Sequence, residues 1–203
     1  MATDFPKRRK NEGGIRGYDK EYHRAYSSGK RYMWGTCPEG FVRRVAETIA
    51  RSDSKRTSTI LDVGCGEGRH CAYISSVGFR VVGVDVSRVA LHRGLRQDSG
   101  FNFELVLGEC ARLPLKEEVF DSAIDVYTLE FVPKKERYAE EISRVLKRGG
   151  YLFAREARRK TGEEPHSVDQ GELMQALEKA GMKVSDLRIK DGGLELELVA
   201  RRL

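Results

Sequence analysis

The feature that most restricts the fold is an alternation between short apolar runs and amphipathic stretches, which begins at Thr59. This alternation is typical of βαβ units with parallel strands covered by helices. The apolar runs, rich in β-branched residues, are TILDV, RVVGVDV, FELVLG, FDSAIDVY and YLFAREA. We therefore expect an α/β fold with helices on both faces of the sheet.

The C-terminal part of the sequence predicts an antiparallel addition to this sheet. A helix with an aspartate at its N-cap is expected over residues 168–182, and apolar runs at residues 182–189 and 195–203 flank an Asp-Gly-Gly turn. Further helices are expected over residues 40–52 and 134–150, the second closed by two glycines. The predicted fold class is α/β, with a doubly wound, seven-stranded, mostly parallel sheet and a C-terminal antiparallel hairpin.

Length and charge distribution indicate one folded domain preceded by a basic segment. The 203 residues suffice for a single core-forming domain, which we place at residues 41–203. The first 31 residues hold nine basic and four acidic side chains, so they carry +5 of the formal charge of +6. Such a segment can contact nucleic acid or an anionic substrate, although a terminal basic run is more often a solvated end. Residues 1–40 are predicted to be a basic, aromatic and partly flexible segment.

Cysteine spacing and hydropathy bear on the compartment. Cys37, Cys65, Cys71 and Cys110 form no CxxC pair and have no histidine at zinc-ligand spacing, so neither a metal site nor a disulfide framework is predicted. No apolar run approaches the roughly 20 residues that span a bilayer, and no apolar stretch follows the N-terminal charges as in a signal peptide. We expect a cytoplasmic protein without membrane contact.

The segment that indicates ligand binding is the turn after the first strand, where Gly64, Gly66 and Gly68 alternate with other residues. Glycine permits a tight turn and a close approach of the backbone to a ligand, although a turn alone would also explain it. Asp85 ends the second strand about 20 residues later, the separation at which an acid accepts hydrogen bonds from ribose hydroxyls. Arg69 stands where a dinucleotide motif would have its third glycine, so a nucleoside ligand without a diphosphate is favoured.

Four blocks in sequence order carry a family resemblance: TILDVGCGEGRH, VVGVDVS, GECARLPLKEEVFDSAIDVYTLEFV and RVLKRGGYLFARE. They resemble the successive motifs of class I S-adenosylmethionine-dependent methyltransferases of the type 11-like group, over roughly residues 59–157. The resemblance implies a Rossmann-like fold, S-adenosylmethionine as cofactor and methyl transfer as activity. The cofactor-binding residues that it implies are Asp62, Gly64, Cys65, Gly66, Asp85, Val86, Glu109, Cys110, Ala111 and Asp125.

The N-terminal segment is similar, over a short stretch, to thiopurine and tellurite methyltransferases, particularly at Trp34, Gly35 and Pro38. This similarity implies an aromatic lid over the cofactor, with Lys30 or Arg31 facing an anionic group. An ordinary helix docked on the sheet is the alternative interpretation. The residues expected in the lid are Tyr18, Tyr22, Tyr26, Tyr32 and Trp34.

No residue of the sequence stands out as a catalytic base. Many proteins of the family read Leu-Glu-His after the fourth strand, but Phe131 replaces that histidine here. The candidates that remain are Tyr127, His166 and Glu156, together with His23, and simple packing would equally explain Tyr127. A thiol or another soft nucleophile ionises readily near neutral pH and reacts without a strong base. The lack of a base therefore favours such an acceptor.

Three functions are consistent with these features. The first is methyl transfer to a small molecule, and the second is an RNA or protein methyltransferase, or a subunit of one, that uses the basic N-terminus. The third is a non-catalytic scaffold that still binds the cofactor. An Asn-Pro-Pro-Tyr segment is absent after the fourth strand, which argues against methylation of nucleic-acid amino groups. Nothing in the sequence indicates the oligomeric state.

Overall fold

The computed structural model describes residues 15–30, 32–97, 103–158 and 167–203. His166, Arg31 and the basic run near the N-terminus lie outside these residues. Seven strands form one sheet: β1 (Thr59–Val63), β2 (Arg80–Asp85), β3 (Phe103–Leu107), β4 (Phe120–Val126), β5 (Leu146–Ala157), β6 (Met182–Lys190) and β7 (Glu195–Arg202).

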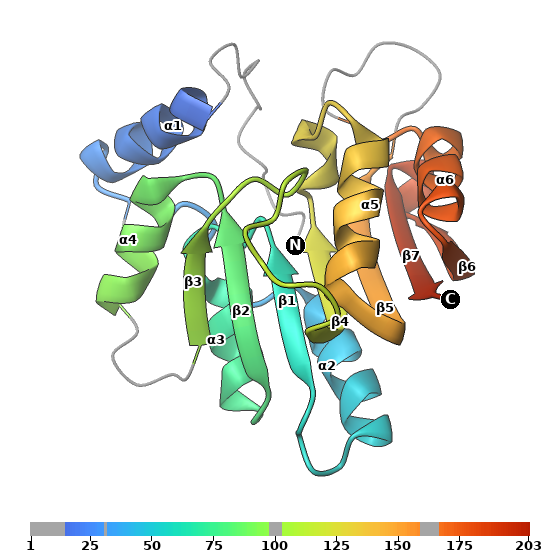
Figure 1. Ribbon diagram of the computed structural model, residues 1–203. Coiled ribbons are helices and arrows are strands. Elements are labelled where there is room, and N and C mark those ends of the chain that lie inside the picture. The colour runs from blue at the N-terminus through green and yellow to red at the C-terminus, as the bar shows by residue number, and fades with distance from the viewer. Residues whose placement is uncertain (1–14, 31, 98–102, 159–166) are drawn as a thin grey trace.

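The strand order is β3-β2-β1-β4-β5-β7-β6 (Figure 1). The first five strands in this order pair in parallel, whereas β7 pairs antiparallel with both β5 and β6. The predicted fold class is thus confirmed, including the C-terminal antiparallel hairpin. The order reverses direction at β1 and β4, and ligands of such sheets bind outside the carboxyl ends of the strands at this point.

Helices pack on both faces of the sheet because successive side chains of each strand point in opposite directions. Ile60 and Leu61 of β1 are both fully buried, each in a different apolar cluster. In Figure 1, α2 and α3 lie behind the sheet and α5 and α6 lie in front of it. The helices are α1 (Ile15–Ser27), α2 (Gly40–Ser52), α3 (Arg69–Ser76), α4 (Arg88–Gln97), α5 (Lys135–Val145) and α6 (Gln170–Lys179).

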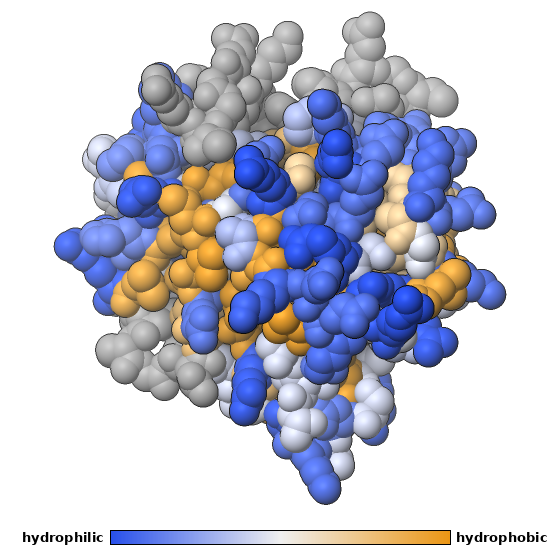
Figure 2. All heavy atoms as spheres, in the orientation of Figure 1, coloured by the Kyte–Doolittle hydropathy of each residue, from blue (hydrophilic) through white to orange (hydrophobic). Residues whose placement is uncertain are grey.

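Helix cover of the front face is incomplete over β2 and β3. The chain from residue 108 to residue 119 crosses this region without forming a helix, and Figure 2 shows apolar side chains gathered there. Val82, Val106 and Leu115 are only partly buried against the core. The short crossing leaves Glu109 and Cys110 at the carboxyl edge of the sheet, beside the end of β2.

Two elements differ from the sequence-based expectation. The helix expected over residues 134–150 ends at Val145, because Leu146 adopts an extended conformation and pairs with Phe120 as the start of β5. Helix α1 lies within residues 1–40, a segment without clear periodicity over its whole length. Its signal is the spacing of Tyr18, Tyr22 and Tyr26, which places three aromatic rings on one face of a helix. In the described ranges, no helix has the length and apolar character needed to cross a bilayer.

Candidate functional site

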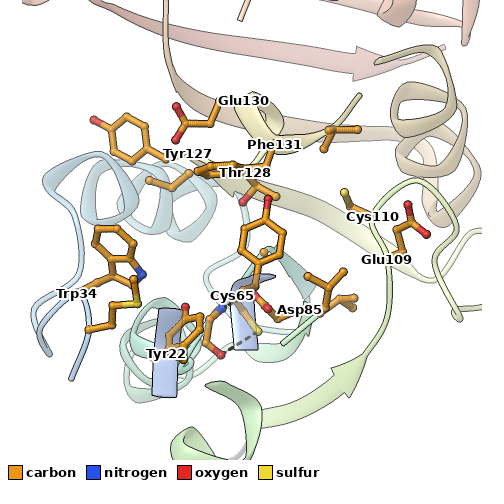
Figure 3. A pocket seen from close by; sticks show the side chains of 18 of the residues that line it. Tyr22, Trp34, Cys65, Asp85, Glu109, Cys110, Tyr127, Thr128, Glu130 and Phe131 are labelled. Carbon is orange, nitrogen blue, oxygen red and sulfur yellow. Dashed lines mark hydrogen bonds between the residues drawn. The ribbon is translucent and has the colours of Figure 1, made fainter. Parts of the chain in front are cut away.

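A cavity of about 570 Å³ lies at the carboxyl ends of β1, β2 and β4 (Figure 3). Its volume falls in the range of small-molecule sites, and its position is the one at which open parallel sheets bind ligands. Ala111 packs against the core outside the cavity wall. The structure brings together eight of the predicted site residues in this wall: Gly64, Cys65, Gly66, Asp85, Val86, Glu109, Cys110 and Tyr127.

The glycine turn between β1 and α3 forms the floor of this cavity. Gly64, Gly66 and Gly68 have φ angles of +67°, +57° and +78°, a region that other residues seldom adopt. A Cβ atom added at Gly64 would overlap the hydroxyl of Thr128 and lie 2.6 Å from its Cγ2. Thr128 in turn donates a hydrogen bond to the carbonyl of Val63 at 3.0 Å. The turn therefore needs glycine for its conformation and for contact with the segment after β4.

Asp85 joins the end of β2 to this turn. Its carboxylate accepts the backbone N–H of Gly66 at 2.8 Å and that of Ser87 at 2.8 Å. Burial raises the pKa of Asp85, and the two backbone N–H groups oppose that shift by stabilising the charged form. An acceptor is thus held in the cavity wall, where ribose hydroxyls could reach it.

Three further acids predicted for the site lie beneath the cavity and are not part of its wall. Asp62, Asp125 and Glu156 are at most 1% exposed. Asp125 accepts hydrogen bonds from the hydroxyl of Tyr138 at 2.6 Å and from the N–H of Thr128 at 3.2 Å. Burial raises the pKa of Asp62 to about 7, and burial together with Asp125 raises the pKa of Glu156 well above its usual value. Burial and the neighbouring carboxylate of Asp125 thus both favour the protonated form of Glu156.

Tyr127 lines the cavity but its hydroxyl is already engaged. The residue follows β4 with φ of +60°, an uncommon conformation for a bulky side chain. Its hydroxyl donates a hydrogen bond to Glu195 and accepts one from Nε of Arg155 at 3.0 Å. Burial is the main cause that raises the pKa of Tyr127. The left-handed conformation redirects the chain after β4, so that Thr128 lies over the glycine turn.

Glu67 in the glycine turn binds the N-terminal segment in two places. Its carboxylate accepts the hydroxyl of Tyr26 at 2.6 Å and the N–H of Met33 at 2.9 Å. Arg69, the first residue of α3, donates to the carbonyl of Trp34 at 2.8 Å. These three contacts hold the segment across the cavity. Sequence reasoning missed Glu67, although a charged residue inside a glycine turn was a signal for it.

Helix α1 is also attached to the N-terminus of α4. Asp19 accepts the hydroxyl of Ser87 at 2.6 Å and the N–H of Val89 at 3.2 Å. Tyr22 is 7% exposed, and a Cβ atom added at Gly66 would lie 2.8 Å from its hydroxyl. Two of the aromatic residues expected in a lid are not in the cavity wall, since Tyr26 binds Glu67 and Tyr32 is half-buried elsewhere. The three that line the cavity are Tyr18, Tyr22 and Trp34.

The end of the cavity opposite Glu109 and Cys110 carries aromatic side chains together with the charged side chains of Arg69 and Glu130. Its wall includes the residues that follow β4, and Figure 3 shows Glu130 and Phe131 there, with Trp34 on the other side. Glu130 lies in a short 3₁₀ turn, Leu129–Phe131, and is 7% exposed. The sequence drew attention to Phe131 only because a histidine was missing. It did not single out Glu130 or Thr128.

The cavity has two features that suit a polar, nucleoside-containing cofactor. The first is the glycine turn beside Asp85. The second is His70 at the start of α3, which is 5% exposed and whose buried Nε2 has no hydrogen-bond partner among the described residues. Burial lowers the pKa of His70 to about 3, so the ring is neutral. An unpartnered polar atom in a cavity wall is satisfied when a ligand supplies the partner.

Comparisons with known proteins agree with this geometry. Residues 61–154 match the family model described as a methyltransferase domain. A probable S-adenosylmethionine-dependent methyltransferase of Mycolicibacterium smegmatis is 27% identical over 188 residues, which are 86% of this chain and 72% of that protein. A sterol 4-C-methyltransferase of Caenorhabditis elegans is 28% identical over 110 residues, which are 52% of this chain and 32% of that protein. The chain thus spans about a third of the length of this curated relative.

The same fold occurs in a solved structure of a TehB-like S-adenosylmethionine-dependent methyltransferase from Corynebacterium glutamicum. The two superpose with a TM-score of 0.69 at 19% identity, over 93% of this chain and 98% of that chain. The sheet order and the glycine turn agree with class I S-adenosylmethionine-dependent methyltransferases, the group that these comparisons support. The chain carries the methyltransferase domain of this class, and S-adenosylmethionine is the cofactor that the domain implies.

Proposed function

We propose that this chain transfers a methyl group from S-adenosylmethionine to a small-molecule acceptor. The observation that carries the proposal is that one cavity extends from the glycine turn and Asp85 to the aromatic side chains of Trp34 and Phe131. A cofactor and an acceptor would then share one enclosed space. The name of the sterol methyltransferase relative supports a small acceptor.

Residues beneath the cavity and residues in its wall would bind the cofactor in different ways. Asp62 and Asp125 would act from beneath, since Asp125 fixes the backbone of Thr128 and Asp62 accepts the thiol of Cys71 at 3.2 Å. The predicted residues in the cavity wall would contact the cofactor itself: Asp85 the ribose hydroxyls, Glu109 the adenine amino group, Val86 and Cys110 the adenine ring, and the backbone of Gly64, Cys65 and Gly66 the methionine end. Ala111, which packs outside this wall, would support Cys110 from the core.

The chemistry that bound S-adenosylmethionine supplies is an electrophilic methyl group. The protein then has to align the acceptor with that methyl group and exclude water. We infer that residues 1–40 act as a lid on the domain of residues 41–203, because Glu67 and Arg69 hold Tyr26, Met33 and Trp34 across the cavity. The free thiols of all four cysteines are consistent with the cytoplasmic location that we propose.

A strong base is not required in this proposal. Of the predicted catalytic residues, Tyr127 lines the cavity with its hydroxyl bound to Glu195 and Arg155, while Glu156 lies beneath it. We propose that Tyr127 shapes the acceptor end and that Glu156 supports Asp125; His166 lies outside the described residues. A thiol or another soft nucleophile stays a candidate acceptor. Glu130 adds a carboxylate to the cavity wall, so other classes of acceptor are candidates as well.

Calorimetric titration with S-adenosylhomocysteine tests the cofactor site. Asp85→Ala removes the ribose acceptor and unpairs two backbone N–H groups, so the free energy of cofactor binding should become less favourable by about 1–3 kcal/mol. Asp121→Ala is a matched control. Asp121 also accepts a backbone N–H, that of Thr59 at 2.8 Å, but it lies near the start of β4, whereas the cavity is at the end of that strand. Equal affinity in wild type and Asp85→Ala would contradict the ribose assignment.

Transfer of labelled methyl groups tests the acceptor class. We expect label in low-molecular-weight products when the protein is incubated with small thiols, amines and alcohols. Label found only in RNA or protein would favour a macromolecular acceptor. Cofactor binding without any transfer to these acceptors would favour the scaffold function.

A further inference from the structure

Glu130 places a carboxylate in the acceptor end of the cavity. The residue is 7% exposed and lines the cavity within the turn that follows β4. Electrostatic attraction is stronger in a cavity walled by protein than in water, because the effective dielectric constant is lower there. A ligand with a positive charge or with N–H donors would therefore gain most from this position.

Aromatic rings surround the same end of the cavity. Tyr18, Trp34, Tyr127 and Phe131 all line it, and the rings of Tyr18 and Phe131 meet edge to face with centroids 5.6 Å apart. Figure 3 shows Trp34, Tyr127 and Glu130 at the end away from Glu109. Aromatic faces attract cations as well as apolar groups. A carboxylate within aromatic walls is suited to an amine on an apolar frame.

We propose that the methyl acceptor is an amine carried by an apolar or aromatic frame, with Glu130 as the residue that recognises its nitrogen. This inference rests on the proposed methyl transfer. An amine that binds as its ammonium would first pass one proton to the Glu130 carboxylate or to water. The lone pair of the neutral amine would then form the new N–C bond while the C–S bond breaks and its electron pair stays on sulfur. The resulting ammonium carries one extra proton, and the Glu130 carboxylate or water would accept it. Atoms and charge balance without another reactant.

The cofactor is itself a cation, and Glu130 could instead serve its sulfonium. The two roles predict different binding data, because S-adenosylhomocysteine is a neutral thioether at the same position. A carboxylate that recognises the sulfonium would strengthen binding of S-adenosylmethionine over S-adenosylhomocysteine. A carboxylate that recognises the acceptor would leave this ratio unchanged.

The test uses benzylamine, benzyl alcohol and benzyl mercaptan, which share one frame and differ in the nucleophile. In the protein loaded with S-adenosylhomocysteine, calorimetry should show benzylamine bound about tenfold more tightly than the other two. Methyl transfer to benzylamine should exceed the others by a similar factor in kcat/KM. Glu130→Gln should remove this preference through KM. Glu47→Gln, which removes the same charge from an exposed position of α2, should retain it.

Several outcomes would overturn the amine assignment. They are equal binding of alcohol and amine, no amine binding by the loaded protein, a preference for the thiol, and an unchanged preference in Glu130→Gln. A loss of S-adenosylmethionine affinity in Glu130→Gln without a loss of S-adenosylhomocysteine affinity would assign Glu130 to the sulfonium. Failure of the wild type to bind S-adenosylhomocysteine would instead reject the proposed methyl transfer, so the two failures are distinguishable.

Discussion

Substitution of Gly64 by alanine tests whether the glycine turn is shaped by its contact with Thr128. An alanine at φ of +67° incurs about 1–2 kcal/mol of backbone strain. Its Cβ would also overlap the Thr128 hydroxyl and lie 2.8 Å from the Thr128 Cβ, which adds about 1–3 kcal/mol of overpacking. We expect Gly64→Ala to lower the free energy of unfolding by about 2–5 kcal/mol, and to weaken binding of S-adenosylhomocysteine.

Gly181→Ala is the matched control. Gly181 has φ of +75° and no atom within 4 Å of an added Cβ, so this variant incurs the backbone strain alone. Thr128→Gly removes the obstructing side chain and should cost about 1–2 kcal/mol through the lost hydrogen bond to Val63 and the added chain entropy. The double variant should cost about 1–2 kcal/mol less than the sum of the single variants.

Urea unfolding monitored by circular dichroism measures all four variants. A cost of Gly64→Ala no larger than that of Gly181→Ala would refute the overlap with Thr128, since the close contact would then have no energetic effect. Strict additivity in the double variant would also refute it, because the two residues would not interact. A double variant that recovers stability but not affinity would show that the turn also contacts the ligand directly.

Three further predictions concern single side chains. Glu67→Gln weakens the contacts to Tyr26 and Met33, so hydrogen exchange of residues 18–30 should accelerate about tenfold while the sheet stays protected. Asp62 has a pKa of about 7 in the folded state against 3.8 for an unperturbed aspartate, so it binds its proton more tightly when the chain is folded. Its contribution to stability therefore falls as pH rises from about 4 to 7. Thermal unfolding of Asp62→Asn across this range should depend less on pH than that of the wild type, and parallel curves would reject the shift. Tyr127→Phe should lower the free energy of unfolding by about 1 kcal/mol, because the hydroxyl loses its hydrogen bonds with Glu195 and Arg155, and it should leave kcat unchanged. A lower kcat would show that the hydroxyl takes part in catalysis.

The fold was predictable because its signals are local. The apolar run ending at Asp62 and the run ending at Asp85 each fix a strand, and the glycines between strand and helix fix the turn. The Asp-Gly-Gly sequence at residues 191–193 likewise predicted the hairpin between β6 and β7. The end of α5 was missed because Leu146 has a helical apolar spacing, and only its pairing with Phe120 in the sheet makes it extended.

The site was predictable in part. The turn and Asp85 follow from spacing, but the position of an acid in the wall or beneath it depends on which face of a strand it occupies. Asp85 lines the cavity, whereas Asp125 points into the core toward Tyr138. Glu67 is placed by contacts with a segment that is distant in sequence, and Glu130 is buried among such segments. Such contacts leave no periodic signal in the chain.

The attachment of α1 to the glycine turn has a thermodynamic consequence. In the proposed complex, Tyr22 and the cofactor both lie against Gly66, so docking of the helix and binding of the cofactor are linked equilibria. Linkage is reciprocal: the free energy by which a docked helix tightens cofactor binding equals the free energy by which the cofactor tightens docking. Anything that competes for Glu67 or Asp19 would therefore shorten the residence time of the spent cofactor.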